Sequence, residues 1–113
     1  MAINPDLLKP FVKVSIRDLV RSRVEEIQMV WIQGTLTLIE NNVIELKDSH
    51  GESIRVTLSP NIQKPTNGKY YQVLGYFEGK KTVRAVKVVE IESLILKEMW
   101  PFEVQEMGSL LSK

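Results

Sequence analysis

The chain has 113 residues, 43% of them hydrophobic and 26% charged, which suits one domain with its own core. The absence of Cys excludes a disulfide framework, a thiolate metal site and a Cys nucleophile, and it predicts an intracellular protein. The net charge of +1 is too low for a non-specific polyanion binder. No apolar run approaches the ~20 residues that cross a bilayer.

The N-terminal part is predicted to contain one short helix. Residues 1–10 are charged and broken by prolines, so we expect a loose arm rather than a secretory signal. Phe11–Val14 has an extended pattern. Apolar residues then recur at helical spacing, which predicts a helix from about Ser15 to Arg23, or one turn longer. Ser15 is expected to cap this helix, with Asp18 three residues later as in a capping box.

The middle of the chain alternates between strand patterns and turn signals. The predicted strands cover about 29–39, 43–47, 53–58, 69–77 and 82–91. The first turn contains Asn41 and Asn42, and Asn tolerates a positive φ. A single helical turn is expected to begin at Ser59-Pro60.

The first and last predicted strands carry apolar residues on both faces. One face of the first strand is expected to hold Val30, Ile32, Gly34, Leu36 and Leu38. Trp31 lies on its other face. In the last strand Val86 and Val88 share one face, while Val83, Ala85, Val89 and Ile91 share the other with Lys87. A small barrel needs only one apolar face, so the second face must be covered by a helix or by a partner protein.

These strands predict a mainly β protein, a five-stranded barrel of the oligonucleotide/oligosaccharide-binding (OB) type with a short N-terminal and a C-terminal helix. The chain is expected to be one domain, with the barrel at 29–91. Such a barrel bends its long first strand, and Gly34 is placed for that bend, with Gly75 at a similar corner. An SH3-like barrel is the alternative, but it explains the terminal helix less well.

The C-terminal segment, 93–112, is predicted to be helical. Its apolar face comprises Leu96, Trp100, Val104, Met107 and Leu111, widened by Ile95, Met99 and Phe102. Pro101 cannot continue the hydrogen-bond ladder cleanly, so we expect a kinked helix or two helices meeting there. This stripe is too long for a small barrel to bury completely, and it predicts an interface with another protein, with Trp100 at its centre.

Catalytic chemistry has little support in this sequence, and no enzyme is expected. His50 is the only His and lies in a predicted turn, so it is expected at the surface. Glu103 and Glu106 share a helix face that solvation explains. No metal-ligand cluster, phosphate-binding glycine loop or nucleophile elbow is present, so no metal or cofactor is predicted.

Two features leave nucleic-acid binding open. Residues 47–87 carry eight Lys or Arg against three acids, which indicates either solvated strand edges or a weak nucleic-acid groove. The predicted fourth strand is rich in aromatic residues, and outward aromatics stack bases in some OB proteins. However, Tyr71, Val73, Gly75 and Phe77 form one face that is better placed in the interior.

Four segments, in this order and spacing, resemble the RecQ-mediated genome instability protein 2 family. They are VWIQG (30–34), GKYYQVLGY (68–76), RAVKVVEI (84–91) and EMWPFEV (98–104). The resemblance covers about Phe11 to Val104. It implies a non-catalytic nuclear OB subunit that pairs with the C-terminal OB domain of the first RMI subunit, through its C-terminal helix.

Through that pairing the resemblance implies a complex with topoisomerase III and a RecQ-type helicase of the Bloom class. Such a complex dissolves double Holliday junctions during DNA repair by homologous recombination and DNA replication. A Fanconi anaemia M-type translocase is a further implied partner, with little or no direct DNA binding. Carried over by position, Lys13, Lys87 and Trp100 match family residues at or near the partner surface, and Trp31 is expected beneath a helix or partner.

Two alternatives stay open. The chain could be a stand-alone module that binds single-stranded nucleic acid. It could also be the small subunit of another complex resembling replication protein A, such as the telomere-capping one.

Overall fold

The computed structural model describes residues 12–21 and 28–111, and the side chains of 12–21 and 29–106. Its elements are β1 (Val12–Lys13), α1 (Ile16–Val20), β2 (Gln28–Glu40), β3 (Val43–Lys47), β4 (Ser53–Thr57), β5 (Tyr70–Phe77), β6 (Thr82–Glu90) and α2 (Leu94–Leu111). The predicted mainly β fold is confirmed. The expected N-terminal arm lies outside the described residues. The N-terminal helix ends at Val20, with Arg21 as its C-cap, so the expected end at about Arg23 is wrong.

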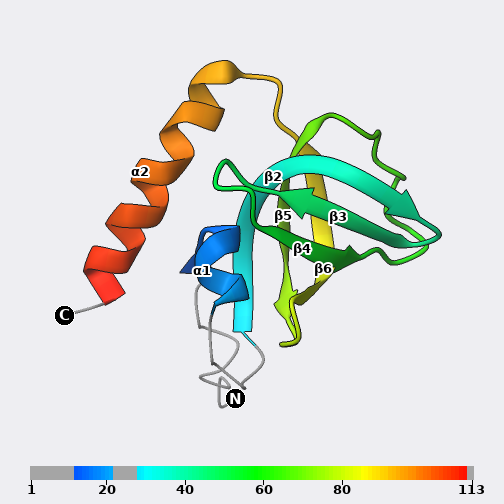
Figure 1. Ribbon diagram of the computed structural model, residues 1–113, viewed down its shortest axis with the longest axis horizontal. Helices are drawn as coiled ribbons and strands as arrows, with labels where there is room; N and C mark the ends of the chain where they lie inside the picture. Colours follow the sequence, from blue (N-terminus) through cyan, green and yellow to red (C-terminus); the bar gives the residue numbers. More distant parts are fainter. Residues whose placement is uncertain (1–11, 22–27, 112–113) are drawn as a thin grey trace, which may run out of the picture.

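The strands β2 to β6 form a closed ring, with α1 at one end (Figure 1). β2 pairs with both β5 and β3, β3 pairs with β4, and β6 pairs with β5, all in antiparallel fashion. A parallel pairing of β4 with β6 completes the ring. The two-residue β1 adds to β2 in parallel. This is the ring that the OB prediction requires.

Gly34 lies where β2 passes from one neighbour to the other. Thr35, the next residue, pairs with Tyr70 of β5 and with Lys47 of β3. A Cβ atom at Gly34 would lie 2.9 Å from both the Lys47 carbonyl oxygen and Ile16 Cδ1. The predicted role of Gly34 in this change of neighbour is therefore confirmed, and the close approach adds a second reason for glycine.

A bulge in β2 overturns the expected position of Leu38. Leu36 pairs with Leu46 and Leu38 pairs with Glu45, which leaves Thr37 as the extra residue. The bulge changes which residues point inward. Leu38 is therefore 51% exposed, and Ile39 packs against the core instead.

A second bulge explains the two-sided apolar pattern of β6. Leu74 pairs with Lys87 and Gly75 pairs with Ala85, so Val86 is the extra residue. Val83 and Ala85 point inward before the bulge, and Val88 packs against the core after it. The predicted grouping of Val86 with Val88 on one face is wrong, because Val86 is 51% exposed.

The core fills the ring from all five strands, and its alternating pattern is clearest on β5. The inward side chains of β5 include Tyr71, Val73 and Phe77, as predicted. From α1, Ile16 and Leu19 join the same core. The Ser15 hydroxyl accepts a hydrogen bond from the backbone N–H of Asp18 at 3.0 Å, which confirms the predicted cap.

The connection between β4 and β5 contains no helical turn, so the expectation at Ser59-Pro60 is wrong. The backbone N–H of Ile62 donates to the Ser59 carbonyl at 3.1 Å, which closes an isolated turn. Pro65 removes a donor shortly afterwards, so a helix cannot extend. At the β2–β3 turn, Asn41 has a φ of 56°, as its residue type predicted.

α2 is a single helix that contains Pro101, so the alternative of two helices is wrong. It leaves the end of β6 and stands beside the ring (Figure 1). It therefore does not plug the ring. Among the described residues, no helix is long and apolar enough to cross a membrane.

Candidate protein-interaction surface

The strands place one row of side chains across four neighbours on the outer face of the ring. Lys13 of β1 pairs with Trp31 of β2. Trp31 pairs with Leu74 of β5, and Leu74 pairs with Lys87 of β6. Directly paired residues point to the same face of a sheet. The register therefore brings together Lys13, Trp31 and Lys87, which the sequence had separated by up to 74 positions.

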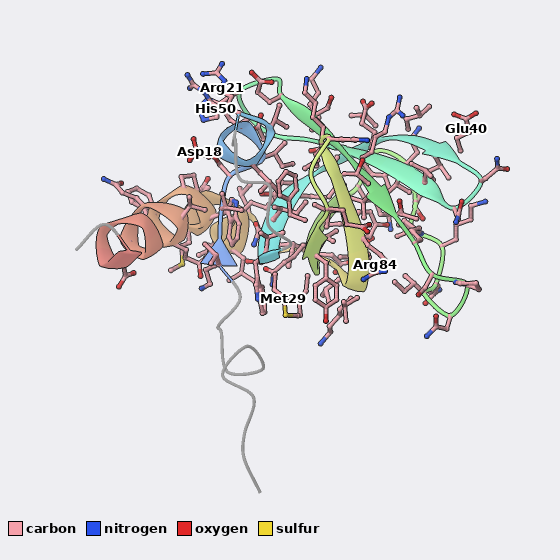
Figure 2. The ribbon with its side chains drawn as sticks, turned by 90° about the horizontal axis from the view of Figure 1, so that it is seen from below. Asp18, Arg21, Met29, Glu40, His50 and Arg84 are labelled. Atoms are coloured by element: carbon pink, nitrogen blue, oxygen red, sulfur yellow. The ribbon has the colours of Figure 1, made fainter. Side chains whose placement is uncertain are left out.

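Further apolar and aromatic groups border this row. The Arg84 guanidinium lies over the Tyr76 ring, 5.3 Å from its centroid. Tyr76 also pairs with Met29, and Figure 2 shows Met29 and Arg84 on the same side of the ring. Val86 is 51% exposed. The result is a mixed apolar and cationic surface, which is typical of protein interfaces.

α2 is attached to the ring by three kinds of contact. The Lys13 ammonium lies 3.2 Å from a carboxylate oxygen of Glu103. Trp100 is 6% exposed, although it does not belong to the main core of the ring. The Lys97 ammonium lies over the Tyr70 ring, 5.1 Å from its centroid. These contacts bury one side of α2 against the outside of the ring.

The opposite side of α2 presents a row of exposed apolar side chains, which we name the α2 stripe. It consists of Ile95, Met99 and Phe102, which are 68%, 49% and 72% exposed. These residues are spaced by four and three positions, so they lie on one face of the helix. Leu94, at the first turn, is 67% exposed. Isolated apolar residues on a surface are ordinary, but a helical stripe of them indicates a missing partner.

This arrangement corrects the predicted apolar face of α2. Trp100 points toward the ring, whereas Leu96 is 50% exposed. Val104 is partly buried and lies on the Trp100 side. The predicted single face is thus divided between a side that meets the ring and the exposed α2 stripe. The side chains of Met107 and Leu111 lie outside the described residues.

Burial alters the acid–base behaviour of one residue beside α2. Desolvation, with a smaller contribution from Asp48, raises the pKa of Tyr70 to about 12. Its hydroxyl therefore stays neutral at physiological pH.

A carboxylate pair lies where β6 ends. A hydrogen bond between Glu90 and Glu92 lowers the pKa of Glu90 and raises that of Glu92. Lys69, 3.0 Å from Glu90, lowers the pKa of Glu90 further, and its own pKa is raised in return. Both carboxyl groups are solvated, so we interpret Lys69 and Glu90 as a surface ion pair.

The described residues assemble no cluster of His, Asp or Glu that could hold a metal ion. His50 is exposed, as predicted, and lies at the rim of a cavity next to α1. The basic hairpin between β5 and β6 is short, and Lys80 and Lys81 have φ values of 52° and 58°. Arg55 lies close to it, since its backbone N–H donates to the Lys81 carbonyl at 3.0 Å.

Two residues of this region were missed by the sequence patterns. Glu103 was assigned to a solvated face, yet it pairs with Lys13, 90 positions away. Gln33 drew no attention, yet it is 4% exposed beneath α2 and donates from Nε2 to Gln72 Oε1 at 2.8 Å. The position of Gln33 on the same strand face as Trp31 was the available signal, because a cover over Trp31 also covers Gln33.

Solved structures that resemble this chain share the OB fold at low sequence identity. A chain of a replication protein A heterotrimer bound to single-stranded DNA has a TM-score of 0.76 and 15% identity, covering 90% of this chain and 98% of that one. A chain of the S. pombe Stn1–Ten1 complex has a TM-score of 0.72 and 11% identity, covering 88% and 94%. The S. pombe telomere capping protein Ten1 has a TM-score of 0.69 and 11% identity, covering 92% and 100%.

No curated protein sequence matches the chain. The family model for RecQ-mediated genome instability protein 2 matches residues 9–108. This range includes every strand of the ring, the α2 stripe, and the row of paired residues Lys13, Trp31, Leu74 and Lys87 on the outer face of the sheet. The chain therefore belongs to the RecQ-mediated genome instability protein 2 family.

Proposed function

We propose that this chain is a non-catalytic, nuclear OB subunit that pairs with the C-terminal OB domain of the first RMI subunit. Through that pairing it stabilises and docks a complex of topoisomerase III with a RecQ-type helicase, which dissolves double Holliday junctions and maintains genome stability. A Fanconi anaemia M-type translocase is a further partner. Membership of the family supports this assignment.

The observation that carries the proposal is the α2 stripe. Ile95, Met99 and Phe102 project away from the ring, on a helix whose other side is already occupied. An amphipathic helix with such a row of anchors is suited to pack against a partner helix. The sheet row of Lys13, Trp31, Leu74 and Lys87 lies next to the side of α2 that contacts the ring. This position supports one continuous interface formed by the sheet row and α2.

Two of the structural neighbours are also subunits of larger assemblies. One belongs to a replication protein A heterotrimer and the other to a Stn1–Ten1 complex. These likenesses show the fold, and they are consistent with a partner that covers the helix.

The test is capture of the purified OB domain of the cognate first RMI subunit by the full chain. Phe102→Glu places a charge in the middle of the α2 stripe, and we expect at least tenfold weaker capture, about 1.4 kcal/mol or more. The matched control is Leu38→Glu. Leu38 is also exposed, at 51%, but it is two residues from Glu40, at the far end of the ring from α2 (Figure 2).

Both variants should keep the melting temperature of the native chain, because neither side chain belongs to the core. Equal capture by native chain and Phe102→Glu would refute the assignment of the α2 stripe as the interface. If only Leu38→Glu weakened capture, the interface would have to lie at the other end of the ring.

A second candidate, a stand-alone module for single-stranded nucleic acid, is favoured by one observation. The hairpin residues Lys80 and Lys81 adjoin Arg55 at the rim of a small cavity of about 300 Å³. Such a cationic tip is suited to contact phosphates. The hairpin is short, however, so docking of a protein partner remains our first choice.

A further inference from the structure

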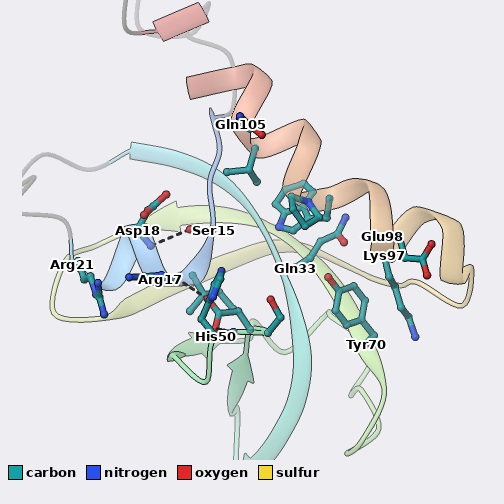
Figure 3. A pocket seen from close by; sticks show the side chains of 16 residues that line it. Ser15, Arg17, Asp18, Arg21, Gln33, His50, Tyr70, Lys97, Glu98 and Gln105 are labelled. Atoms are coloured by element: carbon teal, nitrogen blue, oxygen red, sulfur yellow. Dashed lines mark hydrogen bonds between the residues drawn. The ribbon is translucent and has the colours of Figure 1, made fainter. Parts of the chain in front are cut away.

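Two cavities on the described part of the surface differ in the charges of their walls. The larger one, of about 730 Å³, lies between α1 and α2. Figure 3 shows Asp18 beside Arg17 on one side of it and Glu98 beside Lys97 on the other, so charges of both signs border this cavity. The smaller cavity, of about 300 Å³, lies between β3, β4 and the hairpin that joins β5 to β6. Its wall is mainly cationic, and none of the residues of the α2 stripe belongs to it.

Three cations border the smaller cavity, and all three are exposed. Arg55 comes from β4, and Lys80 and Lys81 come from the hairpin. The ion pairs within the described part of the chain involve other side chains. Three positive charges therefore lie around one small hollow without an ion-pair partner from the described residues.

The hairpin holds its two lysines in a backbone conformation that lysine rarely adopts. Gly79, Lys80 and Lys81 have φ values of 79°, 52° and 58°. In this left-handed region a Cβ atom crowds the following carbonyl, so Gly and Asn are the usual residues. Residues held in such strained conformations cluster at functional sites. The two lysines therefore require a reason beyond the closing of the turn.

Hydrogen bonds fix this hairpin next to Arg55. The backbone N–H of Arg55 donates to the Lys81 carbonyl at 3.0 Å, which joins β4 to the hairpin. Within the hairpin, the backbone N–H of Glu78 donates to the Thr82 carbonyl at 3.0 Å, and that of Thr82 donates to the Gly79 carbonyl at 3.1 Å. The side chains of Arg55 and Lys81 therefore extend from fixed, neighbouring positions, and less ordering is needed when an anion binds.

One carboxylate, that of Glu45, also lines the cavity. Its Oε1 atom accepts a hydrogen bond from the Thr37 hydroxyl at 2.9 Å. Thr37 lies on β2 and Arg55 on β4, and these two strands flank β3, to which Glu45 belongs. The hydrogen bond therefore draws the carboxylate towards β2, away from Arg55. With three cations and one carboxylate, the charge balance of the wall is +2.

We propose that this cavity binds a phosphomonoester group, carried by a phosphoserine or phosphothreonine of a partner protein. Such a group has a charge of about −1.5 to −2 at pH 7 and three strong acceptor oxygens, which match the +2 balance and the cationic donors of the wall. The Ser53 hydroxyl, in the same wall, supplies a neutral donor. Pairing through the α2 stripe uses none of these residues, so the two surfaces are independent.

Single-stranded nucleic acid matches the cavity less well, although the same hairpin would meet its phosphates. Each phosphodiester carries one charge, and binding of a strand relies on a charged groove and on aromatic rings that stack with the bases. None of the described residues that line this cavity is aromatic. The Tyr76 ring, on the neighbouring β5, is already covered by the Arg84 guanidinium. A compact dianion therefore suits the site better than an extended strand.

The experiment uses the full chain, with N-acetyl-O-phosphoserine N-methylamide as the probe. The control probe carries a methyl ester on its phosphate, which makes it a diester with a single charge. The readout is the backbone nuclear magnetic resonance signals of residues 79–82 in low-salt buffer. We expect the phosphoserine probe to shift these signals saturably, and the diester to bind at least about tenfold more weakly. Equal affinities for the two probes, or no saturable shift, would overturn the proposal.

Two single variants separate the site from a general effect of charge. Arg55→Gln should weaken binding of the phosphoserine probe about tenfold or more. Lys64→Gln removes the same charge outside the cavity and should leave the affinity unchanged. Equal weakening by both variants would reduce the effect to net charge and would overturn the site.

The double change of Lys80→Asn with Lys81→Gly tests the strained hairpin. It should abolish the response to the phosphoserine probe and raise the melting temperature, because Asn and Gly tolerate a positive φ. A double variant that binds the probe like the native chain would overturn the proposal, and so would one that melts at a lower temperature. Oligothymidylate without a terminal phosphate, if it shifted the native signals more strongly at equal phosphate concentration, would assign the hairpin to nucleic acid instead.

Discussion

The Lys13 ammonium and the Glu103 carboxylate, 3.2 Å apart, join the first strand of the fold to the middle of its last helix. The two side chains are 34% and 35% exposed, so the pair is neither fully solvated nor buried. It holds the helix at the edge of the sheet row that contains Trp31 and Lys87.

Glu103→Lys should lower the free energy of unfolding by about 0.2–1 kcal/mol, because it replaces a partly exposed attraction with a repulsion. The double swap Lys13→Glu with Glu103→Lys should restore most of the loss. Chemical denaturation of the four proteins in a double-mutant cycle measures the coupling. Additive effects of the two single changes would show that the ion pair contributes nothing to the attachment of α2.

Gly34→Val should be strongly destabilising, by roughly 1–3 kcal/mol or more, since a side chain would overpack the close approach of β2 to β3 and α1. Any Cβ at this position would lie 2.9 Å from the Lys47 carbonyl oxygen, and that oxygen belongs to the backbone and cannot rotate away. Thermal or denaturant unfolding provides the measurement. Thr35→Val, at the neighbouring exposed position, is the control and should change stability little. A Gly34→Val variant that melts like the native chain would contradict the close approach of β2 and β3.

Trp100→Ala should release α2 while the ring stays folded. Truncation of a buried Trp costs about 3–5 kcal/mol in a core, but Trp100 lies outside the core cluster of the ring. The loss should therefore appear as local opening. Hydrogen exchange should show faster amide exchange in α2 and unchanged protection in β2, β5 and β6.

Trp100→Phe retains an aromatic ring and should keep most of the protection of α2. Global unfolding of Trp100→Ala, with protection lost in every strand, would show that α2 is part of the cooperative core.

Charge reversal of Lys80 and Lys81 to Glu should leave capture of the first RMI subunit unchanged, because these residues lie at a hairpin tip away from the α2 stripe. Binding of the isolated chain to a single-stranded oligonucleotide should be weak and should fall steeply with salt, at ~0.7 ions released per phosphate neutralised. Micromolar binding by the native chain that the double variant abolishes would favour the nucleic-acid module over the docking subunit.

Stability should fall as the pH rises from about 10 to about 12. The folded chain holds the proton of Tyr70 with a pKa of about 12, above the ~10 of an unperturbed tyrosine. The unfolded chain loses that proton first, so the stabilisation is fully present below pH 10 and is lost through pH 12. Titration of phenolate absorbance should show one late-titrating tyrosine, absent in Tyr70→Phe. Loss in Tyr70→Phe of a phenol that titrates near pH ~10, in place of the late one, would show that this hydroxyl is not desolvated.

Local chemistry was sufficient to place the strands and turns. Alternation, Asn and Gly at the turns and the Ser15 cap are properties of neighbouring residues, so they are visible in the chain. The bulges at Thr37 and Val86 are not, because a bulge is defined by the strand on the other side. This is why Leu38 and Val86 were assigned to the wrong faces.

The candidate interface was predictable only in part, for the same reason. Lys13 and Lys87 were singled out by resemblance and Trp31 by its strand face, but their shared row depends on the register of four strands. The division of α2 into two apolar sides depends on where the ring lies. Glu103 and Gln33 acquire their roles only when α2 packs on the sheet, which periodicity in the chain does not reveal.

The position of α2 after the last ring strand also determines when its surface becomes available. During synthesis the ring strands leave the ribosome first, and Ile95, Met99 and Phe102 follow once the ring can close. A subunit without its partner then displays three large apolar side chains to the cell. Such a surface invites aggregation or recognition by chaperones and proteases. We therefore expect the abundance of this chain to depend on the supply of a partner that covers this surface.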